Sequence, residues 1–114
     1  MEFEFYIPDR LKEGYGPSIA SFEKLIKNKC KLIITLDCGT TAFKEIDFLN
    51  KKNIDVIVID HHKQADNVPN AYALVNPNKN IDNSNLNNLC AAGVTFLLLV
   101  SLNRSLREIK FFPN

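Results

Sequence analysis

The chain has 114 residues, 46% of them hydrophobic, which fits one globular domain with a buried core. Its 14 basic and 13 acidic side chains give a net charge of +1, which excludes a global basic field, so that nucleic acid could bind only through a local patch. The three cysteines form no CxxC pair, which favours reduced thiols in the cytoplasm over a disulfide framework.

The first half of the chain alternates between strand-like and helix-like segments. The helix-like segments span residues 18–29, with Ser18 as N-cap, and residues 40–53, with Thr40 or Thr41 as N-cap and Asn53 as terminator. The strand-like segments are Phe3–Ile7, Lys31–Leu36 and Asp55–Ile59. This alternation predicts an α/β fold with a parallel, Rossmann-like sheet, whose continuous apolar strands we expect to be covered by helices on both faces.

Two further elements are expected in the second half of the chain. Residues 73–77 read as a short strand that ends at Pro77, and an Asn-rich loop follows it. A long helix is expected from about Cys90 to Ile109. The apolar run from Leu89 to Val100 is shorter than the ~20 residues that span a bilayer, so it predicts a buried helix and no membrane partner.

Polar side chains follow two of the predicted strands at the point where each strand ends. Asp37 follows one of them, and Asp60, His61 and His62 follow the next. Because the carboxyl ends of parallel strands meet at one edge of a sheet, we expect these side chains to converge there. Carboxylates combined with imidazole suit Mn²⁺ or a similar divalent ion, and paired ions of this kind serve phosphoryl-transfer hydrolysis. Adjacent histidines at a strand end cannot easily both face one ion, so one is expected to ligate and the other to face substrate.

Structural or thiol-based explanations of these residues are less well supported. A single aspartate after a strand is commonly a turn or cap residue, but the Asp-His-His triplet together with Asp37 is improbable by chance. Cys38 and Cys90 have no free histidine partner for nucleophilic catalysis. A structural zinc domain would require thiolate pairs that the sequence lacks.

Four stretches of the sequence together resemble a known family. "VIVIDHHK" (56–63) and "LIITLDCGTTA" (32–42) resemble the signature and the preceding aspartate motif of the DHH phosphoesterase superfamily. "YIPDRLKEGYGPS" (6–18) and "LCAAGVTF" (89–96) narrow the resemblance to RecJ-type exonucleases. This resemblance implies removal of nucleotides from the 5′ end of single-stranded DNA, with Mn²⁺ or Mg²⁺, in DNA repair and recombination.

The resemblance also implies a role for individual residues. Asp37 corresponds to a metal-bridging aspartate and His61 to a metal-ligating histidine. His62 corresponds to the histidine that faces the scissile phosphate, and Asp60 to the carboxylate that supports it. Arg10 stands where a basic residue near the nucleotide phosphate is expected.

Parts of the family's pattern are missing from the sequence. It lacks the aspartate-rich first motif, a later aspartate after the long helix, and the separate substrate-binding domain. We therefore expect residues 1–114 to be a partial DHH catalytic domain, from a split or truncated gene, that is inactive alone unless a second polypeptide supplies the missing motifs. The alternatives are a non-catalytic remnant or binding module, and a related phosphoesterase that acts on short oligonucleotides, nucleotide phosphates or pyrophosphate.

Overall fold

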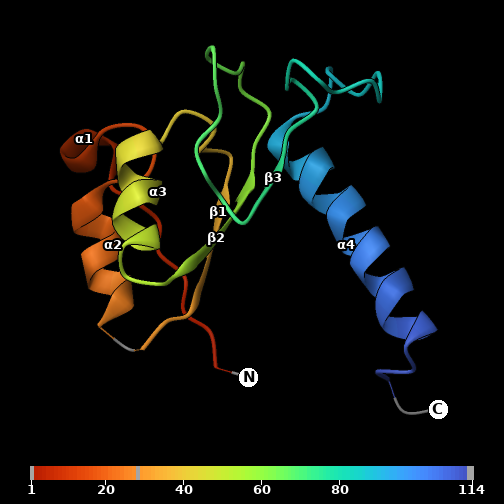
Figure 1. Ribbon diagram of the computed structural model, residues 1–114, viewed down its shortest axis with the longest axis horizontal. Helices are drawn as coiled ribbons and strands as arrows, with labels where there is room; N and C mark the ends of the chain where they lie inside the picture. Colours follow the sequence, from red (N-terminus) through yellow and green to blue (C-terminus); the bar gives the residue numbers. More distant parts are fainter. Residues whose placement is uncertain (1, 28, 113–114) are drawn as a thin grey trace.

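The computed structural model describes residues 2–27 and 29–112. The described residues form, in chain order, α1 (Arg10–Glu13), α2 (Ile19–Ile26), β1 (Leu32–Leu36), α3 (Phe43–Asn50), β2 (Asp55–Ile59), β3 (Ala73–Val75) and α4 (Ala91–Glu108) (Figure 1). The three strands pair in parallel in the order β1-β2-β3. The predicted α/β fold with a parallel sheet is therefore confirmed.

The register of the sheet aligns the carboxyl ends of its strands. Leu36 pairs with Ile59, and Ile59 pairs with Val75. The residues that directly follow these strands, Asp37 and Asp60 among them, therefore leave the sheet at one edge.

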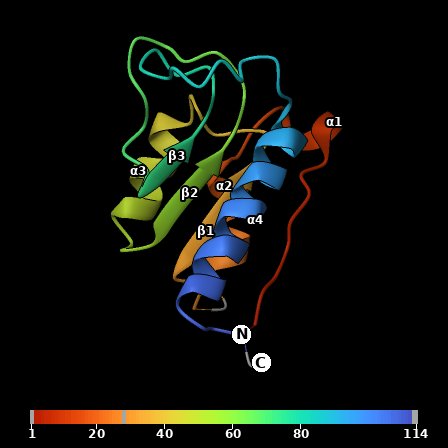
Figure 2. The same cartoon turned by 90° about the vertical axis from the view of Figure 1, so that its right-hand side faces the viewer.

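Helices lie on both sides of the sheet. Helix α3 packs on β2, and α2 packs on α3; α4 lies on the opposite side, where Figure 2 shows it crossing in front of the strands. The core between the sheet and α3 contains side chains with no exposed surface, namely Ile46, Leu49, Val56 and Val58. Burying such side chains contributes about 1.5–3 kcal/mol each, which makes this layer the main support of β2.

The predicted N-cap is confirmed for the first of the two helix-like segments and is wrong for the second. The side chain of Ser18 caps α2 by accepting a hydrogen bond from the Ser21 N–H, as expected, although α2 ends at Ile26. Residue 28, inside the predicted range, lies outside the described residues. Helix α3 was expected to be capped by Thr40 or Thr41, but its N-cap is Ala42, without a side-chain hydrogen bond.

The shift of the α3 cap has a physical cause. The Thr40 N–H donates to Asp60 and its hydroxyl accepts from Asn76, so these groups serve the edge of the sheet instead of the helix. At the other end of the helix, Asn53 has a φ of 56°, which turns the chain into β2 as expected of a terminator.

The predicted strand Phe3–Ile7 is wrong, because these residues form no strand in the structure. Phe3, Phe5 and Ile7 are 80–82% exposed, so their alternation has no face to pack against. The segment is instead held by Tyr6, whose hydroxyl donates to the carboxylate of Glu13 at 2.6 Å. Figure 2 shows this first segment as a thread outside the sheet.

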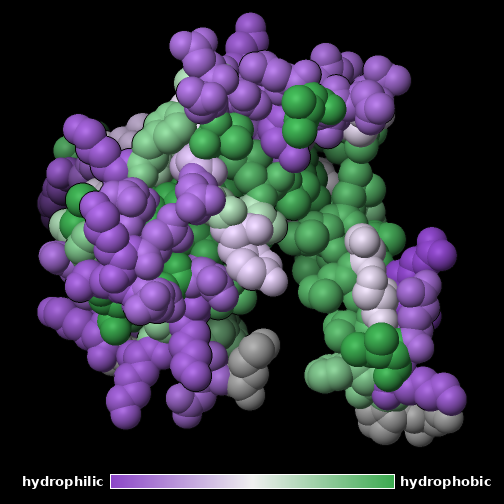
Figure 3. Space-filling view, viewed as in Figure 1, coloured by the Kyte–Doolittle hydropathy of each residue, from purple (hydrophilic) through white to green (hydrophobic). Residues whose placement is uncertain are grey.

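The sequence predicted that helices cover both faces of the sheet and that the long helix is buried. The structure confirms each prediction only in part. Alternate residues of β1 (Leu32, Ile34 and Leu36) are about half exposed, and in α4 only Ala91 and Val94 are buried. The cause is geometric, since only the first turns of α4 approach the sheet and the rest diverges from it (Figure 1). Figure 3 shows apolar surface along the α4 wall of the resulting hollow. Among the described residues, no helix has the length and apolar character to cross a membrane.

Candidate metal and phosphate site

Asp37 occupies a strained position at the tip of β1. Its φ is 61°, a left-handed conformation that Asp tolerates better than most residues, and its N–H donates to the Ile59 carbonyl at 2.9 Å. Gly39 follows with a φ of 114°, where an added Cβ would lie 2.7 Å from Thr35 Oγ1. This glycine lets the chain turn sharply into α3 and leaves the carboxylate of Asp37 exposed at the edge of the sheet.

Asp60 is a buried carboxylate, 1% exposed, at the tip of β2. Its oxygens accept hydrogen bonds from the Thr40 N–H at 3.0 Å and the His61 N–H at 2.8 Å, and lie 2.6 Å from His62 Nδ1. Burial alone would raise the pKa of Asp60, but the hydrogen bonds from Thr40, His62 and His61 outweigh it and lower the pKa to about 2. Asp60 is therefore a fixed negative charge that orients the loop carrying both histidines.

His61 and Asp37 are placed as two ligands of one ion would be. His61 Nε2 and Asp37 Oδ1 are 3.3 Å apart, and an oxygen of Asp37 and a nitrogen from each histidine lie within 4.8 Å of one another. Two donors at right angles around an ion with bonds of about 2.1 Å lie about 3 Å apart, so the Asp37–His61 pair fits a divalent ion such as Mn²⁺ or Mg²⁺. The structure thus brings together Asp37, His61 and His62, with Asp60 directly behind His62.

Two asparagines after β3 support the histidine loop, and the sequence analysis did not identify them. The buried Asn76 side chain donates to Thr40 Oγ1 and to the His62 carbonyl, both at 2.8 Å. The Asn78 side chain donates to the His61 carbonyl at 2.6 Å. The sequence contained a signal for these two residues, because the asparagines of "NPN" come at the end of a predicted strand, as Asp37 and Asp60 do.

Tyr15 is a further residue that the sequence analysis did not identify. Its hydroxyl donates to the Asp37 carbonyl oxygen at 3.0 Å and lies 3.0 Å from Nδ1 and 2.8 Å from Nε2 of His62. Burial and the carboxylates of Asp60 and Asp37 raise the pKa of Tyr15, so it keeps its proton. Arg10, the predicted phosphate contact, lies 5.5 Å from the Tyr15 ring and is therefore one side chain removed from His62.

The thiol of Cys38, close to Asp37, is not set up as a nucleophile. Burial, together with the negative charges of Asp60 and Asp37, raises the pKa of Cys38 to about 11. A thiol with this pKa carries almost no thiolate at neutral pH. Cys38 is therefore not a candidate nucleophile, and the candidate ligands at this edge are carboxylate and imidazole groups.

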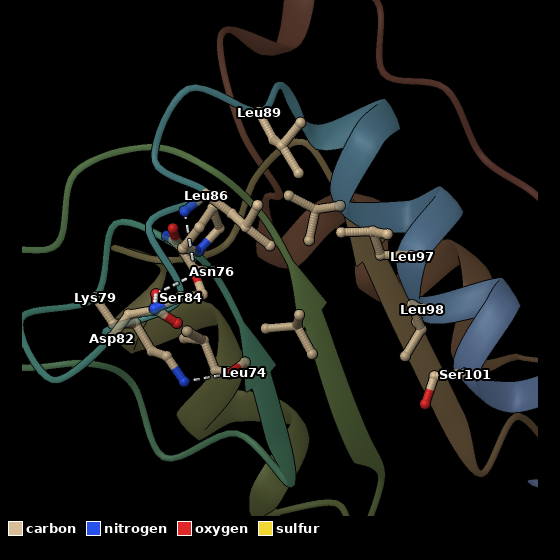
Figure 4. A pocket seen from close by; sticks show the side chains of 13 residues that line it. Leu74, Asn76, Lys79, Asp82, Ser84, Leu86, Leu89, Leu97, Leu98 and Ser101 are labelled. Carbon is tan, nitrogen blue, oxygen red and sulfur yellow. Dashed lines mark hydrogen bonds between the residues drawn. The ribbon is translucent and has the colours of Figure 1, made fainter.

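A separate cavity of ≈ 370 Å³ lies between β3 and α4 (Figure 4). Leu74, Leu97 and Leu98 form part of its apolar wall, and Lys79 lies at its edge, where the ammonium donates to the Leu74 carbonyl at 3.0 Å. No histidine lines this cavity, whereas the sheet edge combines carboxylates with imidazoles. The candidate metal site is therefore at the sheet edge.

The chain is similar to several known proteins. Residues 1–112 match the model of the DHH family, N-terminal domain. The chain is 34% identical over 111 residues to the single-stranded-DNA-specific exonuclease RecJ of Haemophilus influenzae, and this match covers 97% of the chain and 19% of the relative. It is 37% identical over 101 residues to RecJ of Bacillus subtilis, covering 89% of the chain and 13% of the relative.

A solved structure is also similar. The crystal structure of exonuclease RecJ bound to manganese superposes with a TM-score of 0.76 at 35% identity, covering 89% of the chain and 25% of that protein. The chain thus spans about a fifth of the length of the Haemophilus relative, and the similarity concerns one part of a longer enzyme.

Proposed function

The chain belongs to the DHH family, and on that premise we propose that its sheet edge is part of a metal-dependent site that hydrolyses phosphodiester bonds of single-stranded DNA. The observation that carries the proposal is the 3.3 Å approach of Asp37 Oδ1 to His61 Nε2 beside a histidine held by a buried carboxylate. The similar RecJ structure is bound to manganese, which supports Mn²⁺ as the ion here, with Mg²⁺ as the alternative.

Each residue of the site has a proposed role. Asp37 and His61 would hold the ion, which when bound supplies an activated water and braces the leaving oxygen. His62, oriented by Asp60, would donate a hydrogen bond to a phosphate oxygen and stabilise the negative charge that develops there. Arg10 would contact a nearby nucleotide phosphate as a fixed cation.

The wider assignment follows the relatives, whose names describe single-stranded-DNA-specific exonucleases. We propose 5′-to-3′ exonuclease activity in DNA repair and recombination in the cytoplasm, with residues 1–114 as a partial DHH catalytic domain. The aspartate-rich motif, a later aspartate and the substrate-binding domain would come from additional sequence or from a second polypeptide. The coverage of only 19% of a relative's length supports this division.

Metal binding can be tested on the chain directly by calorimetry with Mn²⁺. Because Asp37 and His61 supply only part of a ligand set, we expect a dissociation constant weaker than about 1 μM. His61→Ala should abolish the binding, whereas the exposed carboxylate variant Asp47→Ala should leave it unchanged. No binding by the unsubstituted chain, or equal binding by the His61→Ala variant, would contradict the proposed site.

A nuclease assay distinguishes a partial enzyme from a complete one. With 5′-labelled single-stranded DNA and Mn²⁺, we expect negligible release of nucleotides by the 114-residue chain. In a protein that also contains the missing motifs, His62→Ala should lower turnover about a hundredfold and leave Mn²⁺ binding largely intact, since it removes one donor to the transition state. Rapid release of nucleotides by the 114-residue chain alone, lost in its His62→Ala variant, would refute the proposal that the chain is only part of an enzyme.

The second candidate is a non-catalytic remnant or binding module. One observation favours it, since within residues 2–27 and 29–112 the group formed by Asp37, His61 and His62 is the single cluster that could hold a metal. Two-metal hydrolysis needs more ligands than these residues provide. Retained binding of single-stranded DNA, without turnover even when the missing motifs are added, would support this candidate.

A further inference from the structure

The two adjacent histidines are held in different ways. His61 Nε2 lies 3.3 Å from Asp37 Oδ1, a distance that is long for a charge-assisted hydrogen bond and suits two ligands of one ion. His62 Nδ1 lies 2.6 Å from Asp60 Oδ1. The Tyr15 hydroxyl lies 3.0 Å from His62 Nδ1 and 2.8 Å from His62 Nε2, so it lies against the imidazole ring. The ring of His62 is therefore held by two residues, Asp60 and Tyr15.

Tyr15 is 59% exposed, but it is held by contacts with Asp37 and Arg10. Its hydroxyl lies 3.0 Å from the carbonyl of Asp37, which fixes it to the tip of β1, and the guanidinium of Arg10 lies 5.5 Å from its ring. The flanking Gly14 and Gly16 have φ values of 79° and 84°, so the backbone turns sharply on both sides of Tyr15.

The turn that carries Tyr15 is anchored to the body of the protein through Glu13. The Glu13 carboxylate accepts hydrogen bonds from the Tyr6 hydroxyl at 2.6 Å and the Ser21 hydroxyl at 2.9 Å, and Lys24 lies 3.8 Å away. Because Ser21 is buried in α2, this network ties the turn to the helical layer. Tyr15 thus links three elements: the anchored turn, the tip of β1 and the histidine loop.

We propose that Tyr15 is a positioning residue that, together with Asp60, holds the imidazole of His62 beside the metal position and leaves His61 as the histidine ligand. The inference rests on the proposed metal site, in which His61 is the histidine ligand, and adds the residue that keeps its neighbour His62 from becoming one. Both are within reach, because a nitrogen of each lies within 4.8 Å of an oxygen of Asp37. Without the Tyr15 hydroxyl, the imidazole of His62 loses one of the two contacts that hold its orientation and becomes free to turn toward the ion.

A double-mutant cycle with Mn²⁺ as the probe tests this selection. In the unsubstituted chain, His62→Ala should change the Mn²⁺ dissociation constant less than about twofold. In a Tyr15→Phe background, His62 becomes a ligand, so adding His62→Ala should weaken binding about tenfold, a typical effect of losing a group that supports a metal site. Tyr72→Phe makes the same chemical change at an exposed tyrosine that precedes β3, and it serves as the matched control.

Nuclear magnetic resonance of the imidazole nitrogens gives a second readout that a merely structural role would not produce. In the metal-free chain, Tyr15→Phe should shift the ring ¹⁵N signals of His62 and leave those of His61 nearly unchanged, while Tyr72→Phe should shift neither. Circular dichroism confirms that each variant is folded.

The outcomes separate this inference from the function on which it rests. If the unsubstituted chain binds no Mn²⁺, the proposed metal site fails and the inference falls with it. If Mn²⁺ binds and His61→Ala abolishes binding, but His62→Ala has the same effect with and without the Tyr15 hydroxyl, the inference alone is overturned. Unchanged His62 signals in the Tyr15→Phe variant would overturn it as well.

Discussion

Replacing the buried carboxylate of Asp60 with an amide probes the electrostatic basis of the site. The carboxylate accepts hydrogen bonds from Thr40, His61 and His62, and all of these partners are donors. The Asn side chain of Asp60→Asn would turn an NH₂ group toward at least one of them, so that buried donors would face each other. We therefore expect the free energy of unfolding to fall by about 2–4 kcal/mol near neutral pH.

The same contacts make the stability depend on pH. The pKa of Asp60 falls from its ordinary value of 3.8 to about 2 on folding. This difference corresponds to about 2.5 kcal/mol, at about 1.4 kcal/mol per unit. Because the folded pKa lies below the unfolded one, this stabilisation is complete above about pH 5 and is lost as the pH falls from about 4 to about 2.

Urea titrations followed by far-ultraviolet circular dichroism measure both effects. Near neutral pH the Asp60→Asn variant should unfold at lower urea than the parent. This difference in unfolding free energy should narrow by about 2 kcal/mol by about pH 2, where Asp60 of the parent is half protonated. Asp47→Asn, an exposed carboxylate paired with Lys51 at 2.7 Å, should cost less than about 1 kcal/mol. If the unfolding free energies of Asp60→Asn and the parent differ by the same amount at all pH values, the charge of Asp60 does not stabilise the fold as described.

Three further substitutions test the supports of the site by urea titration. Gly39→Ala should cost about 2–3 kcal/mol, because a φ of 114° and the 2.7 Å approach to Thr35 both disfavour a Cβ, and a variant as stable as the parent would contradict this turn geometry. Ile46→Ala should cost about 2–5 kcal/mol, since Ile46 is 0% exposed, whereas Ile81→Ala, at 86% exposed, should be neutral; equal costs would argue against the core described. Ser18→Ala removes the cap of α2 and should cost about 1 kcal/mol; no change would show that this hydrogen bond is unimportant.

The local pattern of the sequence determined most of the secondary structure. The strand Asp55–Ile59 has the predicted bounds, because a continuous β-branched run beside Asn53 has few alternatives to a buried strand. The long helix runs from Ala91 to Glu108, within one residue of its predicted ends. The grouping of Asp37 with His61 also followed from sequence, because parallel strands end at a common edge.

Only the tertiary structure decided which apolar segments found a partner. Alternation in Phe3–Ile7 is typical of a strand, but a strand needs an edge with which to pair and a face on which to pack, and both lie far from it in sequence. The exposure of one face of β1 and of most of α4 has the same cause, since burial depends on what lies opposite.

The detailed geometry of the site likewise depended on contacts between residues distant in sequence. Tyr15 reaches His62 across 47 positions, and Asn76 reaches Thr40 across 36. A local pattern indicates that His61 and His62 leave the sheet together. It does not indicate which of them meets the hydroxyl of Tyr15, and this difference in partners distinguishes the two neighbouring imidazoles.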